Sequence, residues 1–221
     1  SYVWHRWPDG RKLTYVVLMG LGHYDMKMLS SPDEPVYLPT WQDGEGTTQR
    51  CVEAYFYDGT GYALGRLPCA TLAQADAMVD KIVQTEDPAR ADYGAWRNRV
   101  MLVADDDMQR YEYDPIGHHR SSENVARVIQ DGWPAVDMRK VYLFEYEFDH
   151  SLEKPAAAQA LMGEINAGLG YVNYFGHGGD NVWSDEHVLS TDDVDDLTNA
   201  GRYPVINSLS CSVGRFDAPD H

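Results

Sequence analysis

A histidine and a cysteine near the end of the chain are the residues best suited to covalent chemistry. His177 lies in the aromatic and β-branched run 171–180, and Cys211 ends a second apolar run, 203–211. A thiolate attacks a carbonyl carbon, and a nearby imidazole lowers the thiol pKa and carries the proton to the leaving amine. The pair predicts cleavage of an amide bond. A structural role for both residues stays open, because a lone cysteine or histidine is commonly a packed core residue.

Two buried strands are expected to position this pair. Both runs are apolar and bounded by turn residues, a pattern typical of strands covered on both faces of a mostly parallel sheet. Reactive groups in such sheets collect beyond the carboxyl ends of the strands. His177 and Cys211 are 34 residues apart, so a helix between adjacent strands would bring them together. Glycines beside His177 would let backbone N–H groups approach an oxyanion.

The order of short motifs along the chain resembles a known family. The run Asn173–Gly178, then Trp183, then a strand ending in Cys211 is similar to the gingipain family of caspase-like cysteine endopeptidases. Gly178 and Gly179 together with Arg215–Pro219 resemble one branch, the sortase-like signal peptidase of the type IX secretion system. Other segments follow the family's order: Tyr15–Gly20, Gly65–Pro68, Val79–Ile82, Trp96–Val100 and Val103–Asp106.

The resemblance implies a fold and a domain organisation. We expect an α/β, caspase-like (gingipain-type) three-layer sandwich with a mostly parallel sheet and two subdomains. The linker Asp92–Gly94 places the boundary, with an N-terminal α/β subdomain at 1–94 and a catalytic subdomain at 95–221. The family's pattern extends beyond both ends of the sequence. We therefore expect a fragment, truncated at its C-terminus, of a longer secreted protein.

The resemblance also assigns roles to the pair. Cys211 would be the nucleophile and His177 the general acid and base, with the backbone N–H groups of Gly178 and Cys211 forming the oxyanion hole. In gingipains an acidic residue after the strand at 100–104 lies near the catalytic histidine. Counting along this chain gives Asp107 for that role, with Asp106 as second choice.

Three further residues are expected to bind substrate. Arginine-specific gingipains have an aspartate for the substrate guanidinium where this chain has His119, so an arginine-directed pocket is not expected there. Family members line the same pocket with the residues two before the catalytic pair, here Phe175 and Leu209. These side chains would make the pocket narrower and more apolar.

The implied activity has a narrow and a broad form. The narrow form is removal of C-terminal sorting domains from type IX secretion cargo at the outer-membrane surface of a bacterium. It would involve a β-barrel partner, and a lipopolysaccharide amine could replace water as the acceptor. The broad form is a general extracellular endopeptidase. A non-catalytic binding module that keeps the peptidase fold is the alternative from another class.

Charge and composition limit the partners. The formal net charge of −17 argues against nucleic acid, and no apolar stretch reaches the length of a transmembrane helix. The acidic run Asp105–Asp107 could bind a structural calcium ion or orient His177, although a solvated turn is the commoner outcome for such a run. His118 and His119 lack metal-ligand spacing, so we expect no metal ligands there and no required cofactor.

The remaining cysteines lie around a predicted hairpin. Residues 51–57 alternate in polarity, residues 58–61 form a turn, and residues 62–64 return. A one-residue bulge would align Cys51 with Cys69, so a disulfide and two free thiols are both open. Elsewhere the patterns predict helices at Thr71–Glu86, Ser122–Gln130 and Pro155–Leu169, and strands at Leu13–Met19, Val100–Ala104 and Lys140–Phe148.

Overall fold

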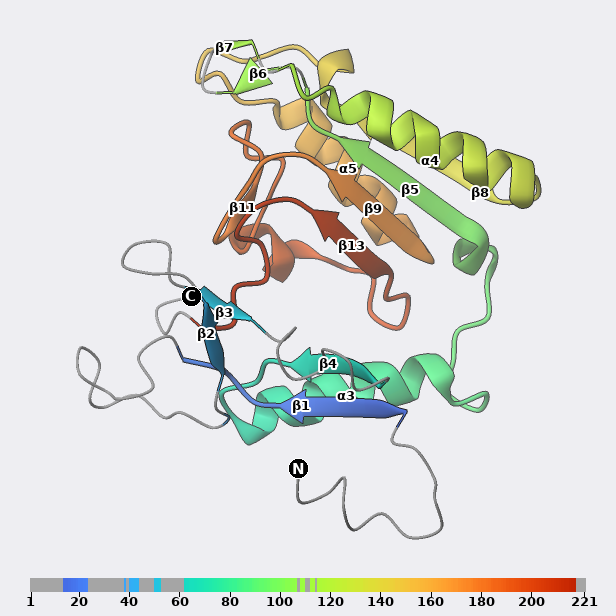
Figure 1. Cartoon of the computed structure of the whole chain (residues 1–221). Coiled ribbons are helices and arrows are strands. Elements are labelled where there is room, and N and C mark those ends of the chain that lie inside the picture. The colour runs from blue at the N-terminus through green and yellow to red at the C-terminus, as the bar shows by residue number, and fades with distance from the viewer. Residues whose placement is uncertain are drawn as a thin grey trace, which may run out of the picture. The chain divides into compact units, whose positions relative to one another are not determined.

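The chain forms two compact units. The computed structural model describes residues 14–23, 38, 40–43, 50–52, 62–106, 108–109, 112–113 and 115–217. One unit comprises Ser1–Asp80 with Arg215–His221, and the other comprises Lys81–Gly214 (Figure 1). The boundary predicted near residue 94 stays a prediction. In the described ranges, no helix has both the length and the apolar character needed to cross a bilayer.

A four-stranded parallel sheet forms the centre of the unit Lys81–Gly214. Its order is β13-β9-β5-β8, made of β5 (Arg99–Ala104), β8 (Asp137–Tyr142), β9 (Tyr171–Phe175) and β13 (Val205–Leu209). All three pairings are parallel. The central strands β5 and β9 carry the longest buried apolar runs, because helices cover both of their faces. The mostly parallel sheet predicted from these runs is confirmed. The predicted burial of the run 203–211 is wrong, because β13 is an edge strand and Val205, Ile206 and Leu209 are exposed.

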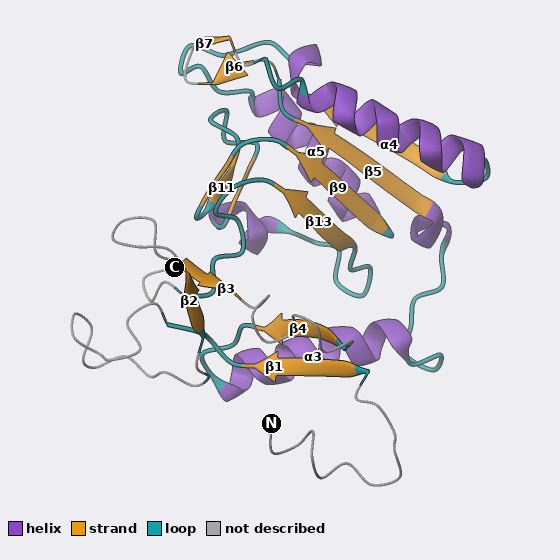
Figure 2. Cartoon of the chain, in the orientation of Figure 1, coloured by secondary structure: helices purple, strands orange, loops and turns teal. Residues whose placement is uncertain are grey.

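Two helices complete a three-layer arrangement, α4 (His118–Gly132) and α5 (Pro155–Ala167). Figure 2 shows them on opposite faces of the sheet. Alternate residues of β5 point to the two sides, as the period of a strand requires. Met101 and Val103 join the core that contains Leu161 of α5, whereas Leu102 packs in a separate cluster with Ala126 of α4.

Local sequence fixes both ends of α5. Pro155 is in the first turn, where its missing N–H costs no hydrogen bond. Gly168 follows the last turn with φ of 95°, and a Cβ at this position would lie 2.9 Å from Cβ of Trp96. Only glycine suits that turn. The chain then enters β9, which completes the β-α-β unit that leads to His177.

Short elements connect the main ones. The 3-10 helices are η3 (Ala95–Asn98), η4 (Leu143–Glu145) and η5 (Asp192–Asp196). The strand predicted at Lys140–Phe148 instead begins at Asp137 and ends at Tyr142, where η4 takes over. β6 (Met108–Gln109) pairs with β7 (Glu112–Tyr113). After β9 the chain forms an antiparallel sheet of β10 (Gly178–Gly179), β11 (Val182–Trp183) and β12 (Leu189–Ser190).

The unit Ser1–Asp80 with Arg215–His221 has its own small sheets. β1 (Tyr15–Met19) pairs in parallel with β4 (Ala63–Leu67), and helix α3 (Leu72–Glu86) begins in this unit. Thr71 caps α3 as predicted, since its hydroxyl accepts from the N–H of Gln74 while the Gln74 side chain accepts from the N–H of Thr71. This reciprocal pair is a capping box.

The hairpin predicted around Cys51 lies largely outside the residues that the structure describes, so it stays a prediction. Within the described residues, β3 (Arg50–Val52) pairs antiparallel with β2 (Trp41–Asp43), and β4 pairs in parallel with β1. Residues 53–61, which include the expected turn, lie outside the description, as does the side chain of Cys51. Cys69 is a buried free thiol, so of the two open alternatives the structure has the free one.

Candidate active site

The neighbouring strands β13, β9 and β5 end at the same level, and the candidate reactive residues follow their carboxyl ends. In the parallel register, Leu209 pairs with Phe175, and Phe175 pairs with Ala104. Cys211 and His177 therefore each lie two residues beyond a directly paired position. The sheet thus brings the 34-residue separation down to adjacent strand ends, as the sequence predicted. Cys211 is a free, exposed cysteine.

The two loops are in direct backbone contact at Gly178. A Cβ on Gly178 would lie 2.7 Å from the carbonyl oxygen of Cys211, 2.8 Å from Cγ2 of Val213 and 2.9 Å from Oγ of Ser210. Any side chain at this position would push the loops apart. The predicted oxyanion donors, the N–H groups of Gly178 and Cys211, belong to residues that lie against each other. Their role as donors stays a prediction.

Buried side chains hold the backbone of His177 on both sides. Its N–H donates to Oδ2 of Asp105 at 2.8 Å, and the hydroxyl of Tyr174 donates to its carbonyl oxygen at 2.6 Å. The Tyr174 ring stacks on Trp183, with centroids 4.3 Å apart and planes within 5°. Both rings are buried. Two buried groups therefore hold the backbone of the residue that carries the imidazole.

The side chain of His177 meets a second histidine. The ring of His118, in the first turn of α4, stands edge-on to it with centroids 5.0 Å apart and an angle of 86°. His118 is buried. The sequence suggests only a metal-ligand role for His118 and gives no sign of this contact, because nothing in it places the start of α4 beside the end of β9.

Two of the three predicted substrate-binding residues are neighbours in the sheet, and the third contacts a different element. Phe175 and Leu209 are direct partners in the register of β9 and β13, so they form one row before the reactive loops. His119 stands edge-on to Phe144 at 5.3 Å between centroids. His119 thus contacts a residue of η4. The role of His119 in substrate binding stays a prediction.

The acidic residues after β5 have different surroundings. Asp105 contacts the backbone of His177, whereas Asp106 forms a buried ion pair of 2.6 Å with Nζ of Lys154. Lys154 also donates to the carbonyl oxygen of Leu143 at 2.7 Å. Asp107, the first choice from the sequence, lies outside the described residues. Asp105 belongs to the acidic run that could orient His177, but the resemblance favours Asp107 and Asp106 over it. The strand register would have indicated Asp105, because Asp105 directly follows Ala104, the partner of Phe175.

Two buried carboxyl groups in this region have raised pKa values. Burial raises the pKa of Asp105 to about 6, against the opposing effect of hydrogen bonds from the backbone of His177 and Asp106. Burial, with the nearby charges of Asp105 and Asp106, raises the pKa of Glu186 to about 7. Both groups therefore change protonation near neutral pH.

The acidic cluster was considered for calcium. Oxygens of Asp105, Asp106 and Glu186 lie within 4.8 Å of one another, and so do ligand atoms of Asp105, His118 and His177. All four aspartate oxygens already accept protein donors: Asp105 from the N–H groups of Asp106 and His177, and Asp106 from the N–H of Met108 and from Lys154. Lys154 also supplies the positive charge. These contacts fit a buried ion pair better than a calcium site.

Comparisons with a family model and with known proteins indicate the same family. Residues 1–221 match the family described as Peptidase family C25. Gingipain R2 of Porphyromonas gingivalis is 36% identical over 215 residues, which cover 94% of this chain and 25% of that protein. A gingipain R1 of the same organism is also 36% identical over 215 residues, which cover 94% of this chain and 19% of that protein. The chain thus spans about a quarter or less of these relatives' length.

Solved structures share the fold. The crystal structure of the Arg specific cysteine proteinase gingipain R matches with a TM-score of 0.64 at 18% identity, over 95% of this chain and 43% of that one. The complex of the Porphyromonas gingivalis RgpB pro- and mature domains matches with a TM-score of 0.59 at 19% identity, over 92% and 43%. These likenesses confirm the predicted caspase-like α/β fold.

Proposed function

The chain belongs to peptidase family C25, and from that premise we propose that it carries the active site of a cysteine endopeptidase. Cys211 is the nucleophile and His177 the general acid and base. The observation that carries the proposal is the parallel register of β9 and β13, which sets both residues two positions beyond the pair Phe175 and Leu209. The close approach of Gly178 to Cys211 supports it.

The reaction follows from the chemistry of the two groups. The Cys211 thiolate forms a bond to the carbonyl carbon of the scissile peptide, and backbone N–H groups of Gly178 and Cys211 stabilise the oxyanion. Protonated His177 then donates its proton to the leaving amine as the carbon–nitrogen bond breaks. In the second half, His177 takes a proton from water, the hydroxide attacks the thioester carbonyl, and the Cys211 sulfur leaves as thiolate.

Asp105 and Tyr174 act as positioning residues in this scheme. They hold the N–H and the carbonyl of His177 through hydrogen bonds of 2.8 Å and 2.6 Å. Fixing the backbone restricts where the imidazole can lie, and a catalytic base must stay within hydrogen-bond reach of its proton. His118 limits the ring from its other side by the edge-on contact.

The substrate pocket is expected to be apolar at its base. The neighbouring side chains of Phe175 and Leu209 would contact the residue before the scissile bond, with His119 in place of the guanidinium-binding aspartate. Arginine at that position is therefore not the expected substrate, unlike in the Arg specific proteinase that shares the fold.

A narrower function rests on sequence resemblance. Gly178 and Gly179 with Arg215–Pro219 are the residues that favour the type IX secretion branch. In that form the secreted enzyme removes C-terminal sorting domains at the outer-membrane surface with a β-barrel partner, and a lipopolysaccharide amine takes the place of water. Incubating the full-length protein with lipopolysaccharide as the amine donor and a cargo protein that ends in a sorting domain tests this form. The expected result is release of the sorting domain, with the amine attached to the new C-terminus of the cargo protein.

Covalent labelling tests the proposed activity itself. A peptidyl acyloxymethyl ketone reacts with an activated cysteine thiolate, so we expect one adduct on Cys211. General extracellular endopeptidase activity, the broader alternative, predicts the same adduct but no requirement for a sorting domain. Intact, folded protein that forms no adduct would favour a non-catalytic binding module.

A further inference from the structure

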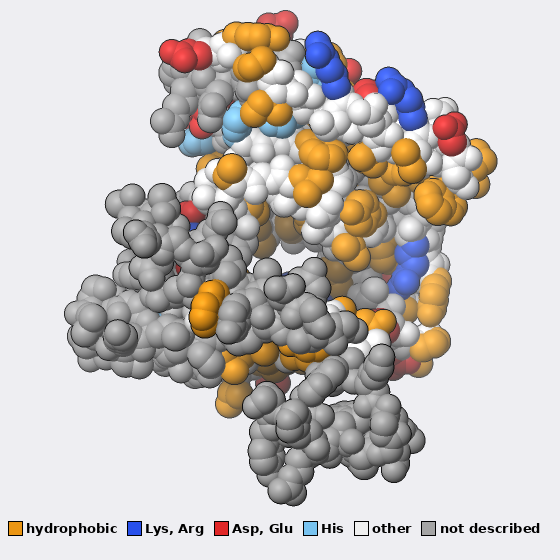
Figure 3. Space-filling model, viewed as in Figure 1, with side chains coloured by type: hydrophobic (Ala, Val, Ile, Leu, Met, Phe, Trp, Pro, Cys, Tyr) orange, Lys and Arg blue, Asp and Glu red, His pale blue; other side chains and the backbone are white. Residues whose placement is uncertain are grey.

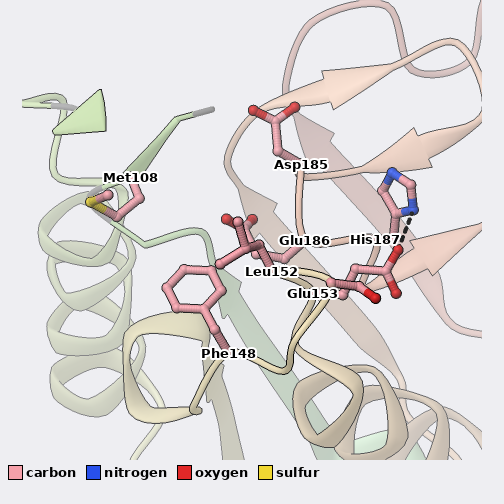
Figure 4. Close-up of a pocket in the computed structure, with 8 residues that line it drawn as sticks. Met108, Phe148, Leu152, Glu153, Asp185, Glu186 and His187 are labelled. Carbon is pink, nitrogen blue, oxygen red and sulfur yellow. Dashed lines mark ion pairs between the residues drawn. The ribbon is translucent and has the colours of Figure 1, made fainter. Parts of the chain in front are cut away.

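A cavity of about 480 Å³ lies in the unit Lys81–Gly214, among the loops beyond the carboxyl ends of β5 and β8. Its lining residues are Met108, Phe148, Ser151, Leu152, Glu153, Asp185, Glu186 and His187. Figure 4 shows Glu186 and Leu152 in the middle of this group, with Met108 and Phe148 on one side and the ion pair of Glu153 and His187 on the other. The proposed catalytic pair does not line this cavity.

The lining combines carbon surface with carboxyl groups. Met108, Phe148 and Leu152 supply apolar side chains, and three acidic residues supply carboxyl groups: Glu153, Asp185 and Glu186. Glu153 is engaged by Nδ1 of His187 at 3.3 Å. An aliphatic chain that ends in a positive charge has the complementary structure, because its stem is apolar and its head is cationic.

Glu186 is the residue that points most clearly to a ligand. Its side chain is 5% exposed, and its Oε2 has no hydrogen-bond partner within the part of the chain that the structure describes. A buried carboxyl oxygen without a partner is unfavourable, because it loses its hydration and gains no bond. A cationic group entering the cavity would supply that missing bond.

The backbone around Glu186 is held in an unusual form. Ser184 and His187 have φ values of 59° and 54°, in the left-handed region that residues with side chains rarely adopt. The N–H of Glu186 donates to Oγ of Ser184 at 3.3 Å. Strained conformations of this kind persist where surrounding contacts impose them, and they often occur at binding sites. Buried Glu186 lies in the chain between these two positions.

The charges around Glu186 favour an organic cation over a metal ion. The carboxyl groups of Asp105 and Asp106 lie beside Glu186, but their oxygens already accept protein donors. The Lys154 ammonium group occupies the position at Asp106 that a bridging divalent ion would need. Glu186 keeps one unused acceptor, which suits a single N–H donor better than a coordination shell.

We propose that this cavity binds a lysine or arginine side chain of a peptide, with the stem between Phe148 and Leu152 and the charged end on Glu186 and Asp185. The proposal rests on the proposed function only in taking the ligand to be a peptide. The site is separate from the pocket expected at the scissile bond, because Phe175, Leu209 and His119 do not line it. It would recognise a basic residue elsewhere in the substrate.

Peptide binding to the full-length Cys211→Ala protein tests the site without requiring catalysis. The probes are acetylated, amidated pentapeptides that are identical except for lysine, arginine or norleucine at the centre, measured by titration calorimetry. We expect the lysine and arginine peptides to bind at least about tenfold more tightly than the norleucine peptide, a difference of about 1.4 kcal/mol. Equal affinities for all three peptides would overturn the proposal.

Isosteric variants locate the binding. We expect two substitutions in the cavity lining to reduce the preference for the basic peptides severalfold. These are Glu186→Gln at the buried carboxyl group and Asp185→Asn at an exposed one. Glu147→Gln, which removes the same charge from an exposed residue outside the cavity, is expected to keep it. An unchanged preference for the basic peptides in both cavity variants contradicts the proposal. A binding heat from calcium chloride alone that Glu186→Gln abolishes also contradicts it, because the site would then bind a metal ion. Because the probes are not cleaved, a failure of labelling at Cys211 would leave this result standing.

Discussion

The backbone N–H of His177 donates a hydrogen bond of 2.8 Å to Oδ2 of Asp105, the first residue after β5. The bond joins the histidine loop to the neighbouring strand through the backbone of His177. The Tyr174 hydroxyl lies 3.3 Å from the same carboxyl oxygen and donates to the carbonyl of His177. The proposed general base is thus held through its backbone by two buried groups.

Asp105→Asn tests this positioning. Asparagine keeps one acceptor oxygen and loses the negative charge, so the bond to His177 is weakened or broken. A hydrogen bond to a charged group contributes about 1.5–3 kcal/mol, so we expect labelling of Cys211 to slow by roughly 10- to 100-fold. Rates of inactivation by the acyloxymethyl ketone across pH 5–8 measure the effect.

The pH profile separates positioning from a general structural effect. With its pKa at about 6, Asp105 is ionised above that pH and accepts most strongly there, so the wild-type rate should rise with pH through about 6. This rise should disappear in Asp105→Asn and persist in Asp131→Asn, a variant of an exposed residue of α4. An Asp105→Asn profile identical to that of the wild type contradicts the assigned role.

Gly178→Ala tests the contact between the two reactive loops. The added methyl group would lie 2.7 Å from the Cys211 carbonyl oxygen, closer than real contacts allow, so the loops must separate. Displacing reactive groups by about 1 Å can cost roughly 100-fold in rate. Gly179→Ala is the matched control, because its nearest contact is Cγ1 of Val182 at 3.3 Å. Equal labelling rates for the two variants would count against the proposed geometry.

Glu186→Gln tests the buried carboxyl group through stability. The pKa of Glu186 is raised from 4.5 to about 7, so the folded state binds its proton more tightly than the unfolded state does. The resulting stabilisation is complete below about pH 4.5 and is lost as pH rises through about 7. A neutral glutamine avoids this loss. We expect the advantage of the variant in unfolding free energy to be about 2 kcal/mol larger at pH 8.5 than at pH 5.5.

Denaturant unfolding at the two pH values measures this difference, with Glu147→Gln as the exposed control. An advantage that is the same at both pH values would show that Glu186 is not a buried acid with a raised pKa.

Much of the sheet could be predicted because its strands carry the signal themselves. The runs that end near His177 and Cys211 are rich in apolar residues and bounded by turn residues, and parallel order with aligned ends follows from that pattern. The pattern does not show that β13 is an exposed edge strand. The structure confirms it in the pairing of Leu209 with Phe175. Thr71 and Pro155 marked helix starts because capping and proline geometry are local properties.

Partners distant in the sequence were not predictable in the same way. Alternation around Cys51 indicates a strand but not its neighbours, and no local pattern in the sequence indicates the pairing of β3 with β2. The buried ion pair of Lys154 with Asp106 joins residues 48 apart, and the edge-on contact of His118 with His177 joins a helix start to a strand end. Neither contact has a local pattern. Counting from the family motif gives Asp107, which lies outside the described residues, and it does not indicate that Asp105 contacts the backbone of His177.

Covalent labelling of the full-length protein by a peptidyl acyloxymethyl ketone tests the central claim most directly. Wild type, Cys211→Ala and His177→Ala are compared by intact mass and peptide mapping, with Cys69→Ala as the control for the buried free thiol. We predict one adduct on Cys211, absent in Cys211→Ala, slowed at least about 100-fold in His177→Ala and unchanged in Cys69→Ala. Folded protein that forms no adduct, or labels equally fast without His177, would contradict the proposed catalytic pair.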